Sequence, residues 1–447
     1  MIEPRVTDDR TPSPVTNWLS NAHPVAFSAF AIVAAFSTYF CMYAFRKPFA
    51  VGAFEGTWDV GFLPPIDFKI ILIVSQVIGY CLSKFMGIKV ISEMTRAGRA
   101  AAIVGVIGFA WASLLLFAIA PVAWKPLCMF LNGIPLGMVW GLVFGFLEGR
   151  KVSEVLGAGL SASYIVASGF VKSVGQFTMD TLGVPEFWMP FVTGALFFPI
   201  MLVAVWGLAQ LPPPSAEDEA ARTKREPMDG KARAAFVLSY APGLFCLTSL
   251  YILLTAYRDF RDNFAREIWD ALGTESAAIL TWSEIPVTVI VLGSLALLMV
   301  IKNNRTALLV VHGLMLSGTA LVGVATFAWQ AGVLDPTLWM VAVGTGLYVA
   351  YVPYGCVLFD RLIAALGVVG TAGFMIYVTD AFGYLGSVAL LLYKNFGQAD
   401  LSWLEFFTKF SYITSIACTL LYLGSLAYFA LLTRGEGGAA PLPAPAK

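Results

Sequence analysis

Two apolar runs of the chain each end in an arginine that shares a helical face with tyrosine. Tyr39, Tyr43 and Arg46 stand at positions i, i+4 and i+7, so a helix would present them on one side. Tyr251 and Arg258 repeat the seven-residue spacing near the middle of the chain. An arginine within a membrane helix is costly unless it faces water, a partner or a ligand. The two faces therefore predict one shared central site.

The chemistry that these arginines offer is anion binding. A guanidinium group presents a planar fork of N–H donors that matches the oxygens of a phosphate or a carboxylate. We therefore predict that Arg46 and Arg258 clamp an anion from two sides. The alternative is that each side chain extends from its helix end to the lipid headgroups. Arg46 would lie roughly 30 Å along a helix that begins at Val25, which keeps this alternative open.

Four further charged residues fall within apolar runs. Lys84 and Lys172 would add positive potential to the site, although Lys84 could instead cap the cytoplasmic end of its helix. Glu284 and Asp380 could pair with the cations, relay a proton, or balance an empty anion site. Lys172 and Asp380 could also form an ion pair across the cavity that breaks in one access state.

Neutral polar residues complete the predicted lining. Gln76, Tyr164 and Tyr377 are candidates, with buried packing as the alternative for each. No nucleotide-binding loop, HExxH motif or Ser/His/Asp arrangement occurs, and the six cysteines lie in apolar runs without metal-ligand spacing. We therefore predict no catalytic residue, no metal site, no cofactor and no enzymatic activity.

Membrane helices are the elements that must position these residues. Of the 447 residues, 58% are hydrophobic and only 13% are charged, with a mean hydropathy of +0.78. Soluble domains carry about 25% charged residues. The composition therefore predicts an all-α integral membrane protein whose main partner is the lipid bilayer. The net charge of zero argues against a nucleic-acid partner.

Apolar runs long enough to cross a bilayer, about 20 residues, occur at roughly twelve places. They lie near residues 24–46, 67–87, 101–120, 126–148, 157–179, 187–210, 236–258, 277–301, 306–329, 337–359, 367–393 and 408–433. The expected parts are a cytoplasmic segment at 1–23, six helices at 24–210, a cytoplasmic linker at 211–235, six helices at 236–433 and a disordered cytoplasmic tail at 434–447. Eighteen of the 28 Lys and Arg residues fall on the side of the termini, which predicts a multi-pass inner (plasma) membrane protein with both termini in the cytoplasm.

The two halves also repeat each other. Tyr39 and Arg46 match Tyr251 and Arg258 at an offset of 212, Leu156-Gly157 matches Leu366-Gly367 at 210, and Tyr164 matches Tyr377 at 213. Three matches at nearly one offset predict two pseudo-symmetric six-helix halves. Such halves place a substrate near the bilayer midplane, between the repeats.

Several segments, in chain order, resemble the major facilitator superfamily and, within it, the organophosphate:phosphate antiporters. The segments are Tyr43-Ala44-Phe45-Arg46-Lys47-Pro48-Phe49-Ala50, Ser83-Lys84-Phe85-Met86-Gly87, Gly137-Met138-Val139-Trp140, Glu284-Ile285-Pro286, Gly370-Thr371-Ala372-Gly373-Phe374 and Gly383-Tyr384-Leu385-Gly386-Ser387-Val388-Ala389. The chain also resembles the uncharacterised branch known as the DUF5690 proteins. The matches extend over most of the chain, and each is short.

The resemblance implies roles for individual residues. Arg46 and Arg258 would correspond to the antiporters' paired phosphate-binding arginines, and Lys84 to their pocket lysine. Lys172 stands near the place of a histidine in that family. The cytoplasmic loop motif of the superfamily survives only loosely between Gly87 and Arg99. Because helices five and eleven also differ in length between matched motifs, the family's substrates do not transfer directly.

The function that we predict is secondary active transport of a small anionic, phosphorylated metabolite by alternating access, with phosphate or a proton as the coupling ion. Exchange against phosphate is implied by the resemblance alone. The alternatives are a proton-coupled symporter of another organic anion or a sugar, and a non-transporting membrane sensor of the same fold.

Overall fold

The computed structural model describes residues 13–59, 61, 64–94, 96–150, 152–215, 218, 230–367 and 372–434. The predicted N-terminal segment, linker and tail lie partly outside these ranges, at residues 1–12, 216–217, 219–229 and 435–447. The described chain is almost wholly helical, as its hydropathy predicts. Within a bilayer a helix satisfies every backbone N–H and C=O group inside one segment.

The first half of the chain forms a short helix and six long ones. They are α1 (Pro14–Asn21), α2 (Pro24–Tyr43), α3 (Phe68–Glu93), α4 (Arg96–Ile119), α5 (Lys125–Leu147), α6 (Ser153–Asp180) and α7 (Met189–Ala209). Helices α3 and α5 pack with their backbones close together. A Cβ atom added at Gly79 would overlap the carbonyl of Phe130, and one at Gly133 would overlap that of Gln76. Small residues allow this close packing between membrane helices.

The second half contains more, and shorter, helical pieces. They are α9 (Gly230–Ser239), α10 (Ala241–Asn263), α11 (Ala265–Ala271), α12 (Ile279–Trp282), α13 (Glu284–Met299), α14 (Asn304–Gln330), α15 (Pro336–Tyr351), α16 (Pro353–Cys356), α17 (Leu358–Leu366), α18 (Ala372–Gly397) and α19 (Trp403–Leu432). Proline causes two of the breaks. Pro286 and Pro353 each lack the N–H that would bond four residues back, so the helix is interrupted before them, between α12 and α13 and between α15 and α16.

Ten spans in the described chain are long and apolar enough to cross a membrane. They correspond to ten of the predicted runs. The other two runs are occupied by the long helices α10 and α18, of which α10 is markedly more polar. Helix α10 carries Arg258, Asp259, Arg261 and Asp262 in its last two turns. The predicted all-α membrane fold of about twelve long helices is therefore confirmed.

The end of the first long helix differs from the prediction. Helix α2 ends at Tyr43, and residues 44–47 form a turn before the 3-10 helix η1 (Pro48–Val51). Pro48 has no N–H with which to continue the α-helix, and the Arg46 N–H bonds to the Tyr43 carbonyl at 3.0 Å. Arg46 therefore does not share a continuous α-helical face with Tyr39 and Tyr43.

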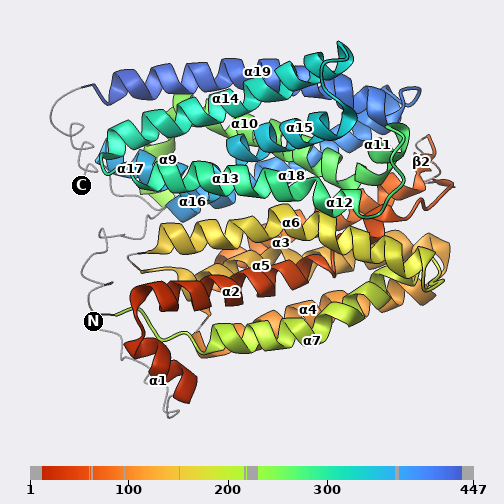
Figure 1. The fold of residues 1–447 in the computed structure, drawn as a ribbon, viewed down its shortest axis with the longest axis horizontal. Helices are drawn as coiled ribbons and strands as arrows, with labels where there is room; N and C mark the ends of the chain where they lie inside the picture. Colours follow the sequence, from red (N-terminus) through yellow and green to blue (C-terminus); the bar gives the residue numbers. More distant parts are fainter. Residues whose placement is uncertain are drawn as a thin grey trace.

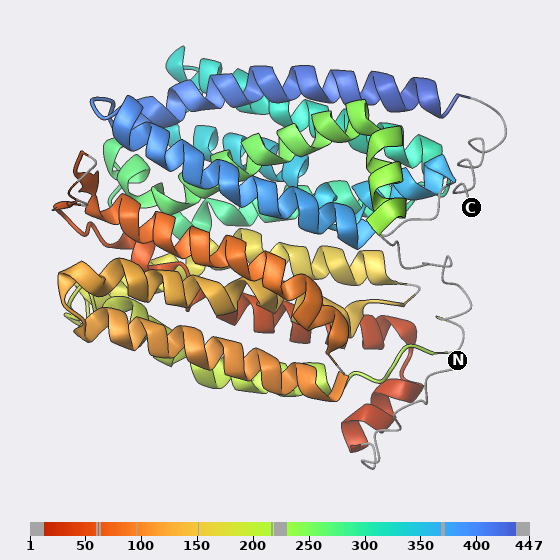
Figure 2. The same ribbon diagram turned by 180° about the vertical axis from the view of Figure 1, so that it is seen from behind.

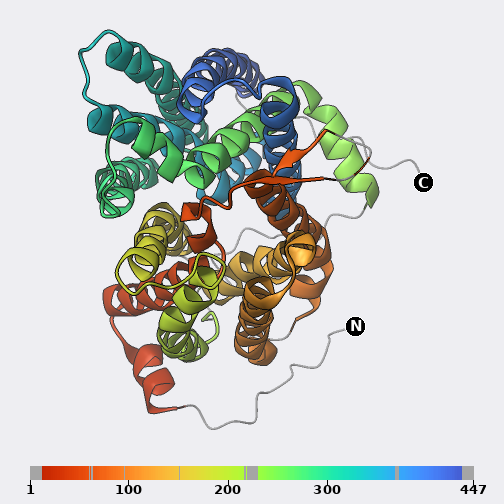
Figure 3. The same cartoon turned by 90° about the vertical axis from the view of Figure 1, so that its right-hand side faces the viewer.

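The helices form two groups that lie side by side, α2–α7 and α10–α19 (Figure 1). Helix α1 and the C-terminal end of α19 lie at one end of the bundle, which we call the terminal end (Figure 1). The opposite, distal end carries α11 and an antiparallel pair of two-residue strands, β1 (Thr57–Trp58) and β2 (Ile66–Asp67), shown in Figure 3. Helices α3 and α18 pack against each other at the boundary between the groups (Figure 2).

Candidate functional site

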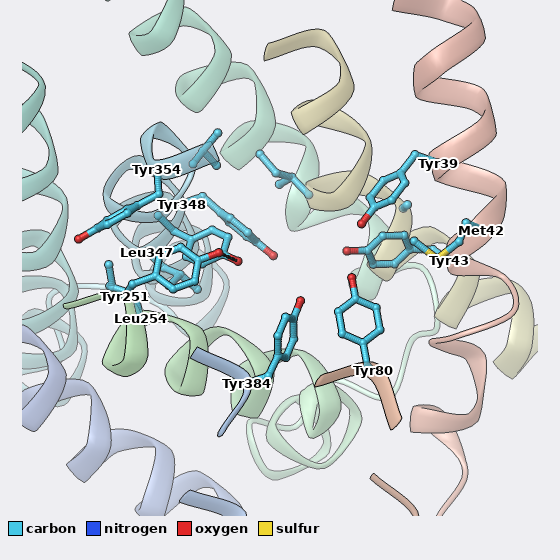
Figure 4. Packing of buried hydrophobic residues seen from close by; sticks show 14 of the residues in the cluster. Tyr39, Met42, Tyr43, Tyr80, Tyr251, Leu254, Leu347, Tyr348, Tyr354 and Tyr384 are labelled. Atoms are coloured by element: carbon cyan, nitrogen blue, oxygen red, sulfur yellow. Dashed lines mark hydrogen bonds between the residues drawn. The ribbon is translucent and has the colours of Figure 1, made fainter. Parts of the chain in front are cut away.

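A cavity of about 60 Å³ lies between the two helix groups. Helices α2, α3, α5 and α6 line it from one group, and α10, α15, α16 and α18 from the other. The lining residues are Tyr39, Tyr43, Tyr80, Lys84, Trp140, Ser161, Tyr164, Tyr251, Arg258, Tyr351, Gly355, Ile376, Asp380 and Tyr384. Half of them are tyrosines. The hydroxyl groups of Tyr39, Tyr43, Tyr80 and Tyr384 point into a common space between the groups (Figure 4).

Arg258 is the arginine that lines the cavity. Its Nη1 donates to the Tyr351 hydroxyl, and its Nη2 lies 2.8 Å from an Asp259 carboxylate oxygen and 3.3 Å from the Tyr384 hydroxyl. The guanidinium carbon lies 4.6 Å from the centre of the Tyr351 ring. These contacts hold the planar group at the cavity wall, where its N–H donors can be shared with a ligand.

Arg46 lies in the interior of the bundle and is only 3% exposed. Its guanidinium carbon is 4.0 Å from the centre of the Tyr80 ring and 5.8 Å from that of Tyr384. Arg258 lies at the same distance, 5.8 Å, from the Tyr384 ring. Tyr384 thus contacts both arginines. Arg46 itself is not among the residues that line the cavity, whereas Tyr80, whose ring contacts its guanidinium group, is.

Lys84 and Asp380 form an ion pair across the boundary between the halves. The ammonium nitrogen lies 3.0 Å from one carboxylate oxygen, and both side chains line the cavity. The other Asp380 oxygen accepts a hydrogen bond from the Tyr251 hydroxyl. Lys84 therefore sits within the site rather than at the end of its helix, which continues to Glu93.

Lys172 has a different partner from the one proposed on sequence grounds. It does not reach Asp380. Its ammonium group lies 2.7 Å from a carboxylate oxygen of Asp262 on α10, and Lys47 lies 2.6 Å from the other oxygen. Ser168 donates to the same carboxylate. Lys172 therefore belongs to a buried cluster at the distal side, outside the cavity lining.

Glu284 pairs within its own half. One of its carboxylate oxygens lies 2.8 Å from Nη1 of Arg261, and Glu284 is 8% exposed. The expected pairing of Glu284 with Arg46, Arg258, Lys84 or Lys172 is therefore not found among the described contacts. Glu284 is the first residue of α13, so the break before that helix directs its carboxylate inward to Arg261.

The neutral candidates divide into three cases. Tyr164 lines the cavity with Tyr39, Tyr43 and Tyr251. Gln76 does not line it. Its amide donates to the backbone carbonyl of Arg46 at 3.1 Å and to the Asn132 side chain at 2.7 Å, so it supports the turn that carries Arg46. The side chain of Tyr377 lies outside the described part of the chain.

Several residues of the site escaped the sequence analysis. Tyr80 and Tyr384 stand four residues before Lys84 and four after Asp380, a helical spacing that could have identified them. Asp259 and Asp262 stand beside arginines on α10, and this concentration of charge in a membrane helix was a second usable signal. Tyr351 gave no comparable signal.

The two halves are joined tightly at the distal end. Besides the Asp262 cluster, Lys69 pairs with Glu267, and the hydroxyls of Ser173 and Thr281 lie 2.7 Å apart. Salt bridges between described residues cross the boundary with one polarity, in which the first half supplies the cation and the second half the carboxylate. These bridges are Lys47–Asp262, Lys172–Asp262, Lys69–Glu267 and Lys84–Asp380.

Comparisons with known proteins agree with this architecture. The model of a family of unknown function, DUF5690, matches residues 48–431. The chain belongs to this family. A solved structure titled "Crystal structure of D-xylose-proton symporter" matches with a TM-score of 0.60 and 14% sequence identity, covering 90% of this chain and 97% of that one. The DUF5690 protein therefore shares the major facilitator fold, as predicted. No curated protein matches the chain.

The site offers cations, phenols and one carboxylate. Among the described residues no group of three or more His, Cys, Asp or Glu side chains could hold a metal ion. The charges that face the cavity are Arg258, Lys84 and Asp380. Such a set suits a small oxyanion with hydroxyl or carbonyl groups that the surrounding phenols can bind.

Proposed function

We propose that this protein is a secondary active transporter of a small anionic metabolite. The observation that carries the proposal is the position of the cavity, which lies between two helix groups and is walled by cations from both, Arg258 and Lys84. Sites at such a boundary serve alternating access, in which the two groups rock about a bound substrate. The DUF5690 family itself supplies no substrate.

The cavity reaches from the middle of the bundle, at Arg258 and Tyr384, toward the terminal end. Ile376 is the fifth residue of α18 and Ser161 the ninth of α6, and both helices begin at that end. Salt bridges close the distal end. These features support a terminal-side-open state, which would face the cytoplasm in the inner membrane if both termini lie there. Opening the distal end would require the Lys47 and Lys172 bonds to Asp262 to break.

The substrate that fits this site best is a phosphorylated metabolite. The oxygens of a phosphate would accept from Arg258 and from Lys84, with Arg46 adding positive charge from behind Tyr80 and the distal Lys172 doing so at longer range. The ion pair between Asp380 and Lys84 would weaken as the anion enters. Exchange against inorganic phosphate is the corresponding antiport mechanism.

Uptake by the purified protein in liposomes tests this proposal. A panel of phosphorylated and carboxylated metabolites should include at least one anion that accumulates inside. Arg258→Lys should lower that uptake by about 10-fold or more, because an ammonium group cannot make the paired hydrogen bonds of the guanidinium. Arg305→Lys, at an exposed position of the terminal end, serves as the matched control. Equal uptake by the Arg258→Lys variant would contradict anion binding at this site.

A second candidate function is proton-coupled uptake of a neutral sugar. It is favoured by the shared fold with a D-xylose-proton symporter and by the tyrosine-rich wall of the cavity. A sugar would be bound through the phenols, so its uptake should persist in the Arg258→Lys variant. Neutral sugars in the same liposome panel therefore separate the two functions. Binding of any ligand without flux would favour a membrane sensor.

A further inference from the structure

A continuous line of hydrogen bonds joins Arg258 to Asp380 along the cavity wall. Nη1 of Arg258 donates to the Tyr351 hydroxyl, which lies 2.8 Å from the Tyr251 hydroxyl, which in turn donates to Asp380. The second oxygen of Asp380 holds Lys84 of the other half at 3.0 Å. Tyr251 is 5% exposed and Tyr351 is 6% exposed. The line therefore runs from the anion site to a bond between the halves.

The direction of the line follows from the number of protons available. A phenol has one proton, and Tyr251 gives its own to the Asp380 carboxylate. The bond between the two phenols must then be donated by Tyr351. Tyr351 in turn accepts from Arg258, which has only donors. Every donor points from the cation toward the carboxylate, and such a line strengthens each of its bonds by mutual polarisation.

We propose that Tyr351 and Tyr251 act as positioning residues that link the occupancy of Arg258 to proton uptake by Asp380. This inference rests on the proposed anion transport and selects its coupling ion. An anion that takes the N–H donors of Arg258 removes the first donor of the line, so Tyr251 donates less strongly to Asp380. The anion also brings negative charge near the carboxylate.

Proton uptake by Asp380 then accompanies anion binding. One O–H bond forms on the carboxylate, and one O–H bond of a hydronium ion in the cavity breaks, which leaves a water molecule. Lys84 keeps its own proton and loses its anionic partner, so the link between α3 and α18 weakens. One anion and one proton thus occupy the site together, which favours symport over exchange.

The groups around Asp380 come from every neighbouring helix. Lys84, Tyr80 and Cys81 face it from α3, Tyr251 and Arg258 from α10, Tyr351 from α15 and Tyr164 from α6, with Tyr384 on its own helix α18. Lys84 and Arg258 are the cations of this set. Lys84 contacts the carboxylate directly, whereas Arg258 reaches it through the two phenols.

Calorimetry of sulfate binding to the detergent-solubilised full-length protein tests the proposal. Sulfate is an oxyanion that does not titrate near neutral pH, so protons taken up on binding belong to the protein. Comparing buffers of different ionisation enthalpy should show uptake of about one proton per sulfate bound by the unchanged protein. Tyr351→Phe and Tyr251→Phe should bind sulfate with almost no proton uptake. Sulfate should also produce a carboxylic-acid band in infrared difference spectra that Asp380→Asn lacks.

Tyr354→Phe is the matched control, because this buried phenol of α16 donates to the Leu247 carbonyl at 2.9 Å and does not line the cavity. It should retain the proton uptake. Sulfate binding without proton uptake by the unchanged protein would overturn the relay and leave the anion site intact. Full proton uptake by folded Tyr351→Phe and Tyr251→Phe would also overturn it. No sulfate binding would instead count against the anion site itself. If one phenylalanine variant does not fold, the other tests the same line.

Discussion

Arg46 is held in the interior mainly by an aromatic ring and by its backbone. The Tyr80 ring lies under its guanidinium group, and a desolvated contact of this kind contributes about 2 kcal/mol. Its Nε atom has no hydrogen-bond partner among the described residues. The charge is therefore available to a ligand that displaces the Tyr80 ring. Gln76 fixes the turn that presents it.

Replacing Gln76 by leucine should loosen that turn. The change leaves the Arg46 carbonyl and the Asn132 side chain without a donor in a buried place, which costs about 1–3 kcal/mol. Thermal unfolding of the detergent-solubilised protein should show a lower midpoint. Gln330→Leu, at an exposed position, should leave the midpoint nearly unchanged. Equal midpoints for the two variants would show that Gln76 does not support the turn.

The sequence identified single residues better than their partners. A charged side chain within an apolar run is costly unless it faces water, a partner or a ligand. This cost identified Arg46, Lys84, Lys172, Glu284 and Asp380 as candidates. Their partners lie on other helices, from Arg261, 23 positions before Glu284, to Asp380, the distant partner of Lys84, and helical spacing cannot reveal such pairs. Lys172 pairs with Asp262 in this structure, and its bridge to Asp380 in another access state stays a prediction. Tyr351 could not be found, because one tyrosine among sixteen carries no signal.

At the scale of elements, α6 and α12 of opposite halves approach each other closely at the distal end. A Cβ atom added at Gly169 of α6 would overlap the carbonyl oxygen of Leu280 on α12, and it would also meet Glu284. The break between α12 and α13 is what brings that carbonyl forward. Glycine is therefore required at this position for the distal end to close in this way.

Gly169→Ala should shift the protein away from this closed distal end. Ser173 and Thr281 lie across the same contact. In a protein whose native cysteines are replaced, cysteines at these two positions should form a disulfide while Gly169 is retained. The yield of this disulfide should fall several-fold when Gly169→Ala is added, because α6 and α12 must move apart to accommodate the methyl group. Gly108→Ala is the control, since a Cβ atom there meets nothing. An undiminished yield would show that the closure tolerates the added methyl group.

The helices themselves were largely predictable, and their ends were less so. Hydropathy located the twelve runs because the bilayer imposes a length and an apolar composition on each. Helix α10 (Ala241–Asn263) is the least apolar of the long helices, and the apolar run predicted at 236–258 overlaps all but its last, charged turn. The early end of α2 follows from Pro48, and the presence of this proline in the sequence was enough to predict a helix end nearby.

At the scale of the whole molecule, the orientation in the membrane is the main expectation still to be measured. The Lys and Arg bias predicts that both termini face the cytoplasm, and α1 and the C-terminal end of α19 lie at the same end of the bundle. A fluorescent protein that folds only in the cytoplasm should be bright when fused after Lys447. An alkaline phosphatase fused there should be inactive. A dark fluorescent protein and an active phosphatase would instead place the terminal end outside the cytoplasm and the closed distal end on the cytoplasmic side.

The polarity of the salt bridges has a consequence for assembly. The first half offers Lys47, Lys69, Lys84 and Lys172 to the boundary, and the second half offers the carboxylates that neutralise them. Two copies of the same half would therefore bring like charges together in a medium of low dielectric constant. If the chain is cut within residues 216–229 and the pieces are produced as separate polypeptides, each should pair with the other and not with itself. Co-purification of the two tagged pieces would reveal an obligate heterodimer, in which sequence-related halves recognise each other by opposite charge.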